Sequence, residues 1–268
     1  MWDPAAYLRF TDHRSRPFDD LLARVAVDDP ATVVDLGCGP GTLTVRLLDR
    51  WPAATVTGLD SSAEMIAAAR ALGSPVRFDV ADVTGWDPDP DLDLVVCNAV
   101  LQWVPGHPAL LTRWADRLPP GAVLAFAVPG NFDAPSHQAI RAVAADPRWR
   151  DRLPTIRGGD VVLDPAGYAV RLLRSGCLVD AWETTYLHLL PAADDDPAAH
   201  PVLAWVEGTA ARPVRTALGD AEWATFRRLL GQELASRYPV RDGMVFFPFR
   251  RVFVVATRRP QPSVGRAR

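Results

Sequence analysis

One short stretch constrains the fold more than any other part of the chain. Residues 32–36, Thr-Val-Val-Asp-Leu, form a mostly apolar, β-branched run, and Gly37, Gly39 and Gly41 follow at alternate positions. An amphipathic segment, residues 42–51, begins directly after them. Glycines permit a tight backbone turn and let a ligand approach without a Cβ in the way. The pattern predicts a buried strand that runs through a glycine-rich turn into a helix N-terminus, where backbone N–H groups are unpaired.

Asp35 lies at the mouth of this predicted turn. A loop that binds only phosphate would not favour a carboxylate there, because both groups are negatively charged. A ligand that carries an ammonium and a sulfonium group would be attracted by it. Asp35 therefore favours S-adenosylmethionine over a nucleotide phosphate as the ligand of the glycine loop.

Strands and helices alternate through the first half of the chain. The predicted strands are residues 33–36, 54–59, 76–80, 92–98 and 122–128, and the helices between them are residues 42–51, 61–71 and 110–118. This alternation is typical of an α/β fold with a doubly wound, mostly parallel sheet, in which right-handed crossovers place helices on both faces. We expect ligands to bind beyond the carboxyl ends of the strands.

Polar residues stand at the carboxyl ends of four successive predicted strands. Asp60 suits the two hydroxyls of a ribose, Asp82 is placed to accept from an adenine amino group, and Asn98 lies beside the expected methyl donor. Taken singly, each residue could be only a helix cap or a turn residue. Four of them in register behind a glycine loop favour a cofactor site. The predicted cofactor-binding residues are Asp35, Gly37, Gly39, Asp60, Asp82 and Asn98.

A nicotinamide dinucleotide site is the nearest competing interpretation of the loop. Its G-x-G-x-x-G fingerprint requires a glycine at position 42, where this chain has Thr42. The G-x-G match alone is a weak signal. Asp35 and the three polar strand ends downstream favour the methyl donor instead.

The regular alternation ends after residue 128. One or two helices are expected at residues 7–27, and further helices at residues 138–145, 165–174, 201–209 and 220–238. A long strand is expected at residues 177–190, and residues 245–256 form either a strand pair or one long bent strand interrupted by Pro248. We expect one domain, residues 1–258, with its cofactor-binding half at residues 30–130. Residues 1–29, 131–160 and 194–240 are expected to form a helical cap over the substrate site, and residues 259–268 a disordered tail.

Composition excludes several classes of partner. The net charge is −3, so no general attraction to nucleic acid or to an anionic membrane is expected. Apart from five histidines, every basic residue is Arg, so an anionic ligand must be met by Arg, His or neutral donors. The three cysteines have no metal-ligand spacing, and no metal is expected. No apolar run could span a bilayer and no signal-peptide pattern begins the chain, so a cytoplasmic location is predicted. Monomer and homodimer both stay open.

The motifs at residues 33–41, Asp60 and Asp82 resemble those of the class I S-adenosylmethionine-dependent methyltransferases. The resemblance implies a seven-stranded Rossmann-like sheet. Further segments resemble the branch of this family that esterifies carboxylates, and they extend over nearly the whole chain apart from residues 148–160 and the tail after Arg258. They are Trp2-Asp3-Pro4, Tyr7-Leu8, Arg14 to Pro17, Leu101-Gln102-Trp103, Trp182 to His188, Trp205-Val206, Gly208-Thr209, Arg212-Pro213 and Phe249 to Ala256.

This resemblance implies formation of a monomethyl ester on one carboxylate of trans-aconitate. Such a carboxylate is already ionised at neutral pH, so the reaction needs no general base, and no catalytic residue is assigned. An acidic protein that binds a tricarboxylate needs local Arg, Tyr, His and Trp donors. The substrate-binding candidates are Tyr7, Arg14, Trp103, Tyr168, Tyr186, His188 and Arg212. For the aromatic residues the alternative is core packing, and for the arginines a solvated surface position.

Other functions remain open at this point. The acceptor could be another small acid, a phenol or an amine. The chain could also bind S-adenosylmethionine without catalysis.

Overall fold

The computed structural model of this chain describes residues 11–156, 158, 161–192 and 199–260, with side chains from residue 15 onward. The chain divides into two compact units. Of the described residues, the sheet unit comprises those within 15–128, 163–183 and 252–260, and the helical unit comprises those within 11–14, 129–162 and 184–251. The predicted boundary of a single domain stays a prediction.

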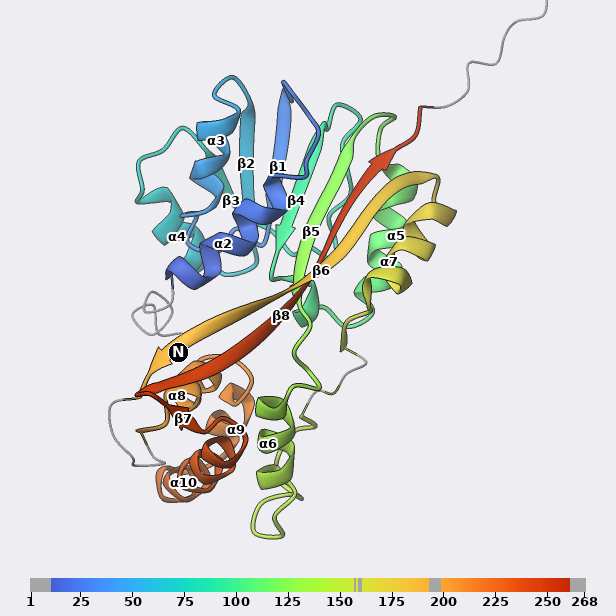
Figure 1. Ribbon diagram of the computed structural model, residues 1–268. Coiled ribbons are helices and arrows are strands. Elements are labelled where there is room, and N and C mark those ends of the chain that lie inside the picture. The colour runs from blue at the N-terminus through green and yellow to red at the C-terminus, as the bar shows by residue number, and fades with distance from the viewer. Residues whose placement is uncertain (1–10, 157, 159–160, 193–198, 261–268) are drawn as a thin grey trace, which may run out of the picture. The chain divides into compact units, whose positions relative to one another are not determined.

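The sheet has the strand order β3-β2-β1-β4-β5-β8-β6, and the short strand β7 pairs with β8 (Figure 1). The first five strands in this order pair in parallel with one another. Their bounds are β1 Thr32–Leu36, β2 Thr55–Asp60, β3 Arg77–Val80, β4 Leu94–Asn98 and β5 Val123–Pro129. The predicted mostly parallel α/β sheet is confirmed, with seven strands on its main path.

β6 (Cys177–Pro191) and β8 (Met244–Arg258) complete the sheet and contribute residues to both units. β8 runs antiparallel to β5, because Gly121 N donates to Arg258 O and Gly130 N donates to Arg250 O. A two-residue strand, β7 (Val240–Arg241), forms a hairpin with the start of β8. The hairpin turns at Asp242 and Gly243, which both have positive φ angles.

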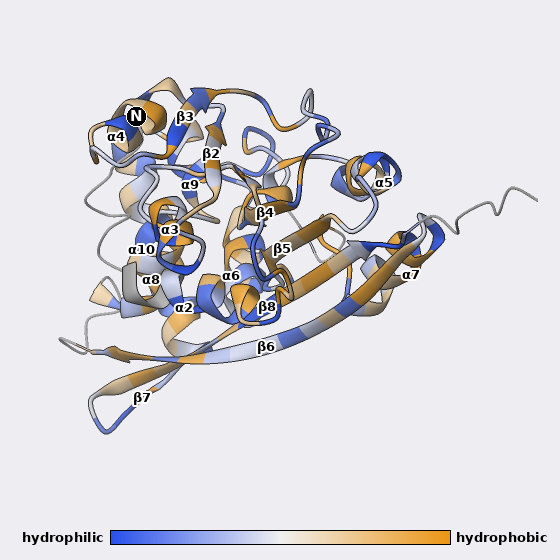
Figure 2. Ribbon diagram, turned by 90° about the horizontal axis from the view of Figure 1, so that it is seen from above, coloured by the Kyte–Doolittle hydropathy of each residue, from blue (hydrophilic) through white to orange (hydrophobic). Residues whose placement is uncertain are grey.

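The central strands are covered on both faces. In β4, Leu94 to Cys97 are all buried, and in β5 every residue from Val123 to Val128 is buried. Figure 2 accordingly colours β4 and β5 largely as hydrophobic. Continuous apolar runs of this kind belong to parallel sheets with helices on both sides.

Helices of the sheet unit occupy the predicted crossovers. Their bounds are α2 Thr11–Leu22, η1 Thr44–Arg46, α3 Leu47–Arg50, α4 Ala63–Arg70, η2 Leu101–Trp103, α5 His107–Arg117 and α7 Pro165–Arg174. Ser62 caps α4 by accepting from Met65 N. None of the helices that the structure describes has the length and apolar character needed to cross a bilayer.

The prediction of one continuous α-helix at residues 42–51 is wrong. A 3₁₀ turn, Thr44–Arg46, leads into the four-residue helix α3. The Thr44 side chain is buried and donates to Asp35, which holds the chain in a tight turn beside β1. Pro52 then disfavours helical geometry at Trp51. The glycine loop therefore does not open a long α-helix.

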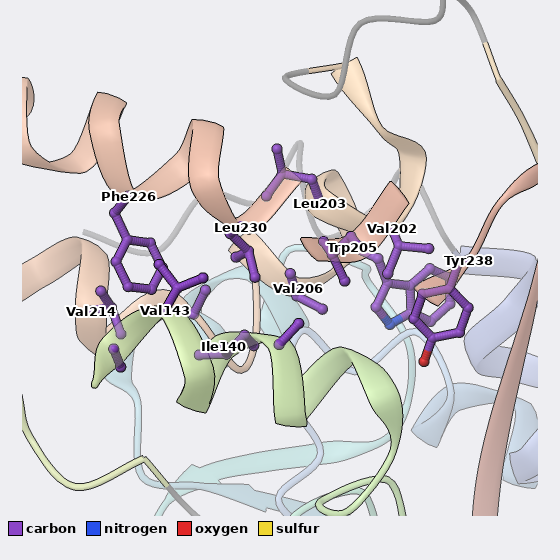
Figure 3. Close-up of a cluster of buried hydrophobic side chains, with 14 of the residues drawn as sticks. Ile140, Val143, Val202, Leu203, Trp205, Val206, Val214, Phe226, Leu230 and Tyr238 are labelled. Atoms are coloured by element: carbon purple, nitrogen blue, oxygen red, sulfur yellow. The ribbon is translucent and has the colours of Figure 1, made fainter. Parts of the chain in front are cut away.

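Helices α6 (Pro135–Ala144), α8 (Pro201–Glu207), α9 (Arg212–Ala217) and α10 (Asp220–Arg237) form the helical unit. α10 packs against α6 and α8. Figure 3 shows Ile140 and Val143 of α6 facing Phe226 and Leu230 of α10 in one buried cluster. α9 was not predicted, since six residues are too few to display helical periodicity.

β8 is one continuous strand that passes through Pro248, where the sequence left a strand pair open as an alternative. Pro has no N–H to donate to a ladder. Arg250 bonds Gly130 just after the end of β5, so Pro248 lies beyond that strand and no ladder partner is lost.

Prediction for the helical cluster. Phe226→Ala should lower the free energy of unfolding by about 3–5 kcal/mol, because it leaves a cavity where a fully buried ring lies between Trp149 and Trp223. Denaturant unfolding followed by circular dichroism measures the change. Arg228→Ala on the exposed face of the same helix is the matched control and should change little. Equal effects of both substitutions would contradict this assignment of the core.

Candidate functional site

The glycine loop connects β1 to η1 in a conformation that only glycine adopts readily. Gly37, Gly39 and Gly41 have φ angles of 74°, 55° and 77°. A Cβ on Gly37 would lie 2.1 Å from Val100 Cγ2, whereas a Cβ on Gly39 would meet nothing within 4 Å. Gly37 is therefore required by packing, and the backbone at Gly39 is the part of the loop that is open to a ligand.

Asp60 at the end of β2 holds this loop. Its Oδ2 accepts from Gly39 N at 2.9 Å, and its Oδ1 accepts from Ser62 N at 2.9 Å. Gly37 N and Cys38 N both donate to Leu59 O. A carboxylate oxygen accepts more than one hydrogen bond, so Asp60 keeps capacity for ribose hydroxyls while it positions the loop.

Asp35 is buried in β1 and has 4% of its surface exposed. Its Oδ2 accepts from Thr44 Oγ1 at 2.6 Å. Burial raises the pKa of Asp35 from 3.8 to about 6, the Thr44 hydrogen bond opposes this rise, and the charge of Asp60 adds to it. A cationic ligand at this position would favour the ionised form.

Asp82 follows β3 and is exposed. Its Oδ1 accepts from both Thr84 N and Thr84 Oγ1 at 2.8 Å. These two bonds to Thr84 lower the pKa of Asp82, so the carboxylate stays ionised as an acceptor. The backbone joins this loop to β2, because Ala81 N donates to Asp60 O.

Asn98 ends β4 and has a buried side-chain oxygen, Oδ1, without a hydrogen-bond partner among the described residues. The next residue, Ala99, has a φ angle of 60°, a strained value for a residue with a Cβ. Ala99 N donates to Ala127 O of β5, which fixes the turn. An unsatisfied buried acceptor at the carboxyl edge of a parallel sheet indicates a ligand with a donor group.

The structure brings the predicted cofactor residues to one edge of the sheet unit. Asp35 pairs in register with Gly58 of β2 and with Val96 of β4, so the ends of these three strands are adjacent. The open space above Gly39, the acids and the Asn98 oxygen fit a ligand with an ammonium, a ribose and an adenine. The sequence analysis did not identify Thr44 and Thr84, which donate hydrogen bonds to Asp35 and Asp82. A hydroxyl residue that follows each acid closely in the sequence was the signal that could have indicated them.

A cavity of about 310 Å³ adjoins the Asp82 loop within the same unit. Thr84, Val104, Pro105 and the first half of α5 line it. Trp103, a predicted substrate residue, precedes this segment, and 51% of its surface is exposed. Trp103 is therefore available to a ligand.

The other substrate candidates have different positions. Tyr168 is fully buried in the sheet unit, its hydroxyl lies 2.6 Å from His107 Nε2, and burial raises its pKa to about 12. This position favours packing between α7 and α5 over substrate contact. Arg212 is exposed on α9 of the helical unit. Tyr7 and the side chain of Arg14 lie outside the described residues.

Tyr186 and His188 share the buried face of β6 in the helical unit, with 4% and 5% of their surfaces exposed. The His188 ring stacks on Trp205, with ring centroids 4.8 Å apart. It also contacts Phe249 at 5.8 Å. The structure thus places two of the predicted substrate residues on one buried strand face, and His188 belongs to an aromatic cluster.

The described residues offer neither a metal centre nor a reactive thiol. Their His, Cys, Asp and Glu side chains form no group of three that could hold a metal ion. All three cysteines are buried, and burial raises the pKa of each thiol. A thiol kept protonated is a poor nucleophile.

The fold and this edge define a Rossmann-like methyltransferase, and a sequence profile of the methyltransferase domain matches residues 33–121. Two solved structures share the fold at 20% and 13% identity. One is the putative methyltransferase bound to the Haloferax volcanii Trm112 activator, with TM-score 0.55 over 96% of this chain and 95% of that one. The other is the Haemonchus contortus phosphoethanolamine N-methyltransferase 2 with S-adenosyl-L-methionine, with TM-score 0.53 over 91% and 53%.

Much closer relatives identify the family. The trans-aconitate 2-methyltransferase of Mycobacterium sp. (strain KMS) is 59% identical over 259 residues, 96% of this chain and 99% of the relative. That of Mycobacterium tuberculosis (strain ATCC 25177 / H37Ra) is 49% identical over 96% of both chains. The chain therefore belongs to the trans-aconitate 2-methyltransferase family. The predicted class of enzyme and its cofactor, S-adenosylmethionine, are confirmed by this membership.

Prediction for Asp35. The folded chain binds the Asp35 proton more tightly than the unfolded chain, so this group costs stability as pH rises from about 4 through 6. Asp35→Asn removes the ionisation. The free energy of unfolding of the variant relative to the native chain should therefore rise by about 3 kcal/mol between pH 4 and pH 7. Denaturant unfolding across this pH range measures it.

Asp82→Asn is the control, because the lowered pKa of Asp82 gives the opposite direction of change. A pH-independent difference for Asp35→Asn would show that its carboxyl group is not perturbed by burial.

Proposed function

We propose that this chain transfers the methyl group of S-adenosylmethionine to a carboxylate of trans-aconitate and forms its monomethyl ester. The observation that carries the proposal is the identity of 59% over nearly the full length of a relative with this name. The set of acids at the carboxyl edge of the sheet supports the same cofactor independently of that name.

Each cofactor residue has a role that its position supports. Asp35 would attract the ammonium group, and Asp60 would accept from the ribose hydroxyls while it holds Gly39. Asp82 would accept from the adenine amino group. Asn98 would accept a hydrogen bond through its buried Oδ1.

The reaction does not require a residue that removes a proton from the acceptor. S-adenosylmethionine supplies a methyl group made electrophilic by the sulfonium. The acceptor is a carboxylate that is already ionised, so the residues have only to bind, orient and exclude water. The opposite charges of the two ligands neutralise each other as the methyl moves, and a dry site favours this change.

The binding of the acid is assigned to the predicted substrate residues, with Tyr186, His188 and Arg212 in the helical unit and Trp103 in the sheet unit. Tyr7 and Arg14 would add to them from the N-terminal segment. A cytoplasmic location, the lack of a nucleic-acid partner and the choice between monomer and homodimer stay predictions.

Prediction for ligand choice. Calorimetric titration should show binding of S-adenosylmethionine and none of NAD. Labelled cofactor incubated with carboxylic acids, phenols and amines should then yield a base-labile methyl ester with trans-aconitate. Asp60→Ala is the matched loss-of-binding variant, because it releases Gly39 N and Ser62 N. Transfer only to a phenol or an amine would contradict the proposed acceptor, and binding without transfer would indicate a non-catalytic module.

Prediction for Arg212. Arg212→Ala should reduce methylation of trans-aconitate at least about 10-fold, because a charge-assisted hydrogen bond to a carboxylate is lost. The affinity for S-adenosylmethionine should stay within about twofold of the native value. Arg215→Ala on the same helix is the control, since Arg215 pairs with Asp220 instead. Unchanged turnover of Arg212→Ala would remove this residue from the substrate site.

A further inference from the structure

Strands β6 and β8 form an antiparallel ribbon whose register can be followed at both ends. Ala192 N donates to Gly243 O at one end, and Arg259 N donates to Gly176 O at the other. The same register places His188 opposite Phe247 and Tyr186 opposite Phe249. One pair further along, Thr184 lies opposite Arg251. The Arg251 side chain therefore extends from the same face as the two predicted substrate residues.

Arg251 is a buried cation, with 7% of its surface exposed. Placing a guanidinium inside a protein is costly, so a chain keeps one where its charge is used or well compensated. Contacts within the protein hold it in place, and one of them is with Phe249, whose ring centroid lies 5.4 Å from the guanidinium carbon. Phe249 also contacts Trp205 at 5.5 Å and His188 at 5.8 Å. Arg251 thus stands at the end of an aromatic cluster.

The backbone beside Arg251 is rigidly positioned. The side-chain amide of Asn131 makes two hydrogen bonds to the backbone of Arg250, as a neighbouring strand would. Its Oδ1 accepts from Arg250 N at 2.7 Å, and its Nδ2 donates to Arg250 O at 3.0 Å. Gly130 N also donates to Arg250 O. Gly130 and Asn131 directly follow β5, so Arg251 lies beside the carboxyl end of that strand.

The proposed substrate needs a cationic group such as the Arg251 guanidinium. A tricarboxylate needs cationic donors, and this chain contains Arg but no Lys. A guanidinium can donate two parallel hydrogen bonds to one carboxylate. The flat, conjugated carbon skeleton of an unsaturated acid can lie against aromatic rings. Arg251 and its neighbouring rings provide both features in one place.

We propose that Arg251 binds a carboxylate of the substrate and that the adjoining cluster of His188, Trp205, Phe247 and Phe249 selects flat, unsaturated polycarboxylates. This inference rests on the proposed function and names a residue that the sequence did not single out. Arg251 orients the acid through its guanidinium and takes no proton from it.

Prediction for Arg251. Calorimetry with trans-aconitate, on the full chain loaded with S-adenosylhomocysteine, should show at least a roughly 30-fold weaker affinity for Arg251→Gln than for the native chain. The KM for trans-aconitate should rise to a similar extent, and the affinity for S-adenosylhomocysteine should not change. Arg241→Gln is the matched control, because Arg241 is exposed on the adjoining strand β7. With the native chain, a saturated tricarboxylate should bind more weakly than trans-aconitate.

The outcomes separate the two proposals. A native chain that methylates trans-aconitate, together with an Arg251→Gln variant of unchanged affinity, overturns the role of Arg251 and leaves the proposed function standing. A native chain that binds trans-aconitate through Arg251 without methylating it overturns the proposed function alone. A native chain that does not bind trans-aconitate overturns both. If Arg251→Gln does not fold, Arg251→Lys decides, since it keeps the charge and loses the paired donors: several-fold weaker binding supports the role, and unchanged binding overturns it.

Discussion

The geometry of the cofactor edge depends on one carboxylate, that of Asp60. It accepts from Gly39 N and from Ser62 N, so it fixes the open glycine of the loop and the start of α4 at the same time. Both amides lie next to the ligand edge, where a lost partner would leave a donor unsatisfied. The loop therefore takes its shape from the end of β2, and it needs no long helix after it. This explains how a 3₁₀ turn and a four-residue helix can follow a functional glycine loop.

Two buried charges of opposite sign have corresponding roles in the two units. Asp35 in the sheet unit is held by Thr44, and Arg251 in the helical unit is held against Phe249. Each is expensive to bury, and each matches the charge of one proposed ligand, the cationic cofactor for Asp35 and the anionic acid for Arg251. The transfer turns the sulfonium into a neutral thioether and the attacked carboxylate into a neutral ester, so exclusion of water favours this step.

Local patterns predicted what depends on neighbours in sequence. The five parallel strands follow from apolar runs between turn residues. The acids at the strand ends could be assigned because parallel strands share one edge. The short α3 and helix α9 could not be predicted, because α3 depends on the contact of Thr44 with Asp35 and α9 on packing in the helical cluster. The sequence could not choose between a strand pair and one strand at Pro248, because the choice depends on where β5 ends.

The sequence by itself determined the parallel sheet, the glycine loop and the ligand class, because alternating apolar runs and acids at fixed positions are local properties. Only the tertiary structure decided which polar groups are buried and which face they occupy. It placed Tyr168 in packing against His107, and it left the Asn98 oxygen without a partner. It also set Arg251 beside the aromatic cluster. These outcomes depend on strand register and on contacts between residues more than a hundred positions apart, such as that of Asn131 with Arg250, which no local pattern encodes.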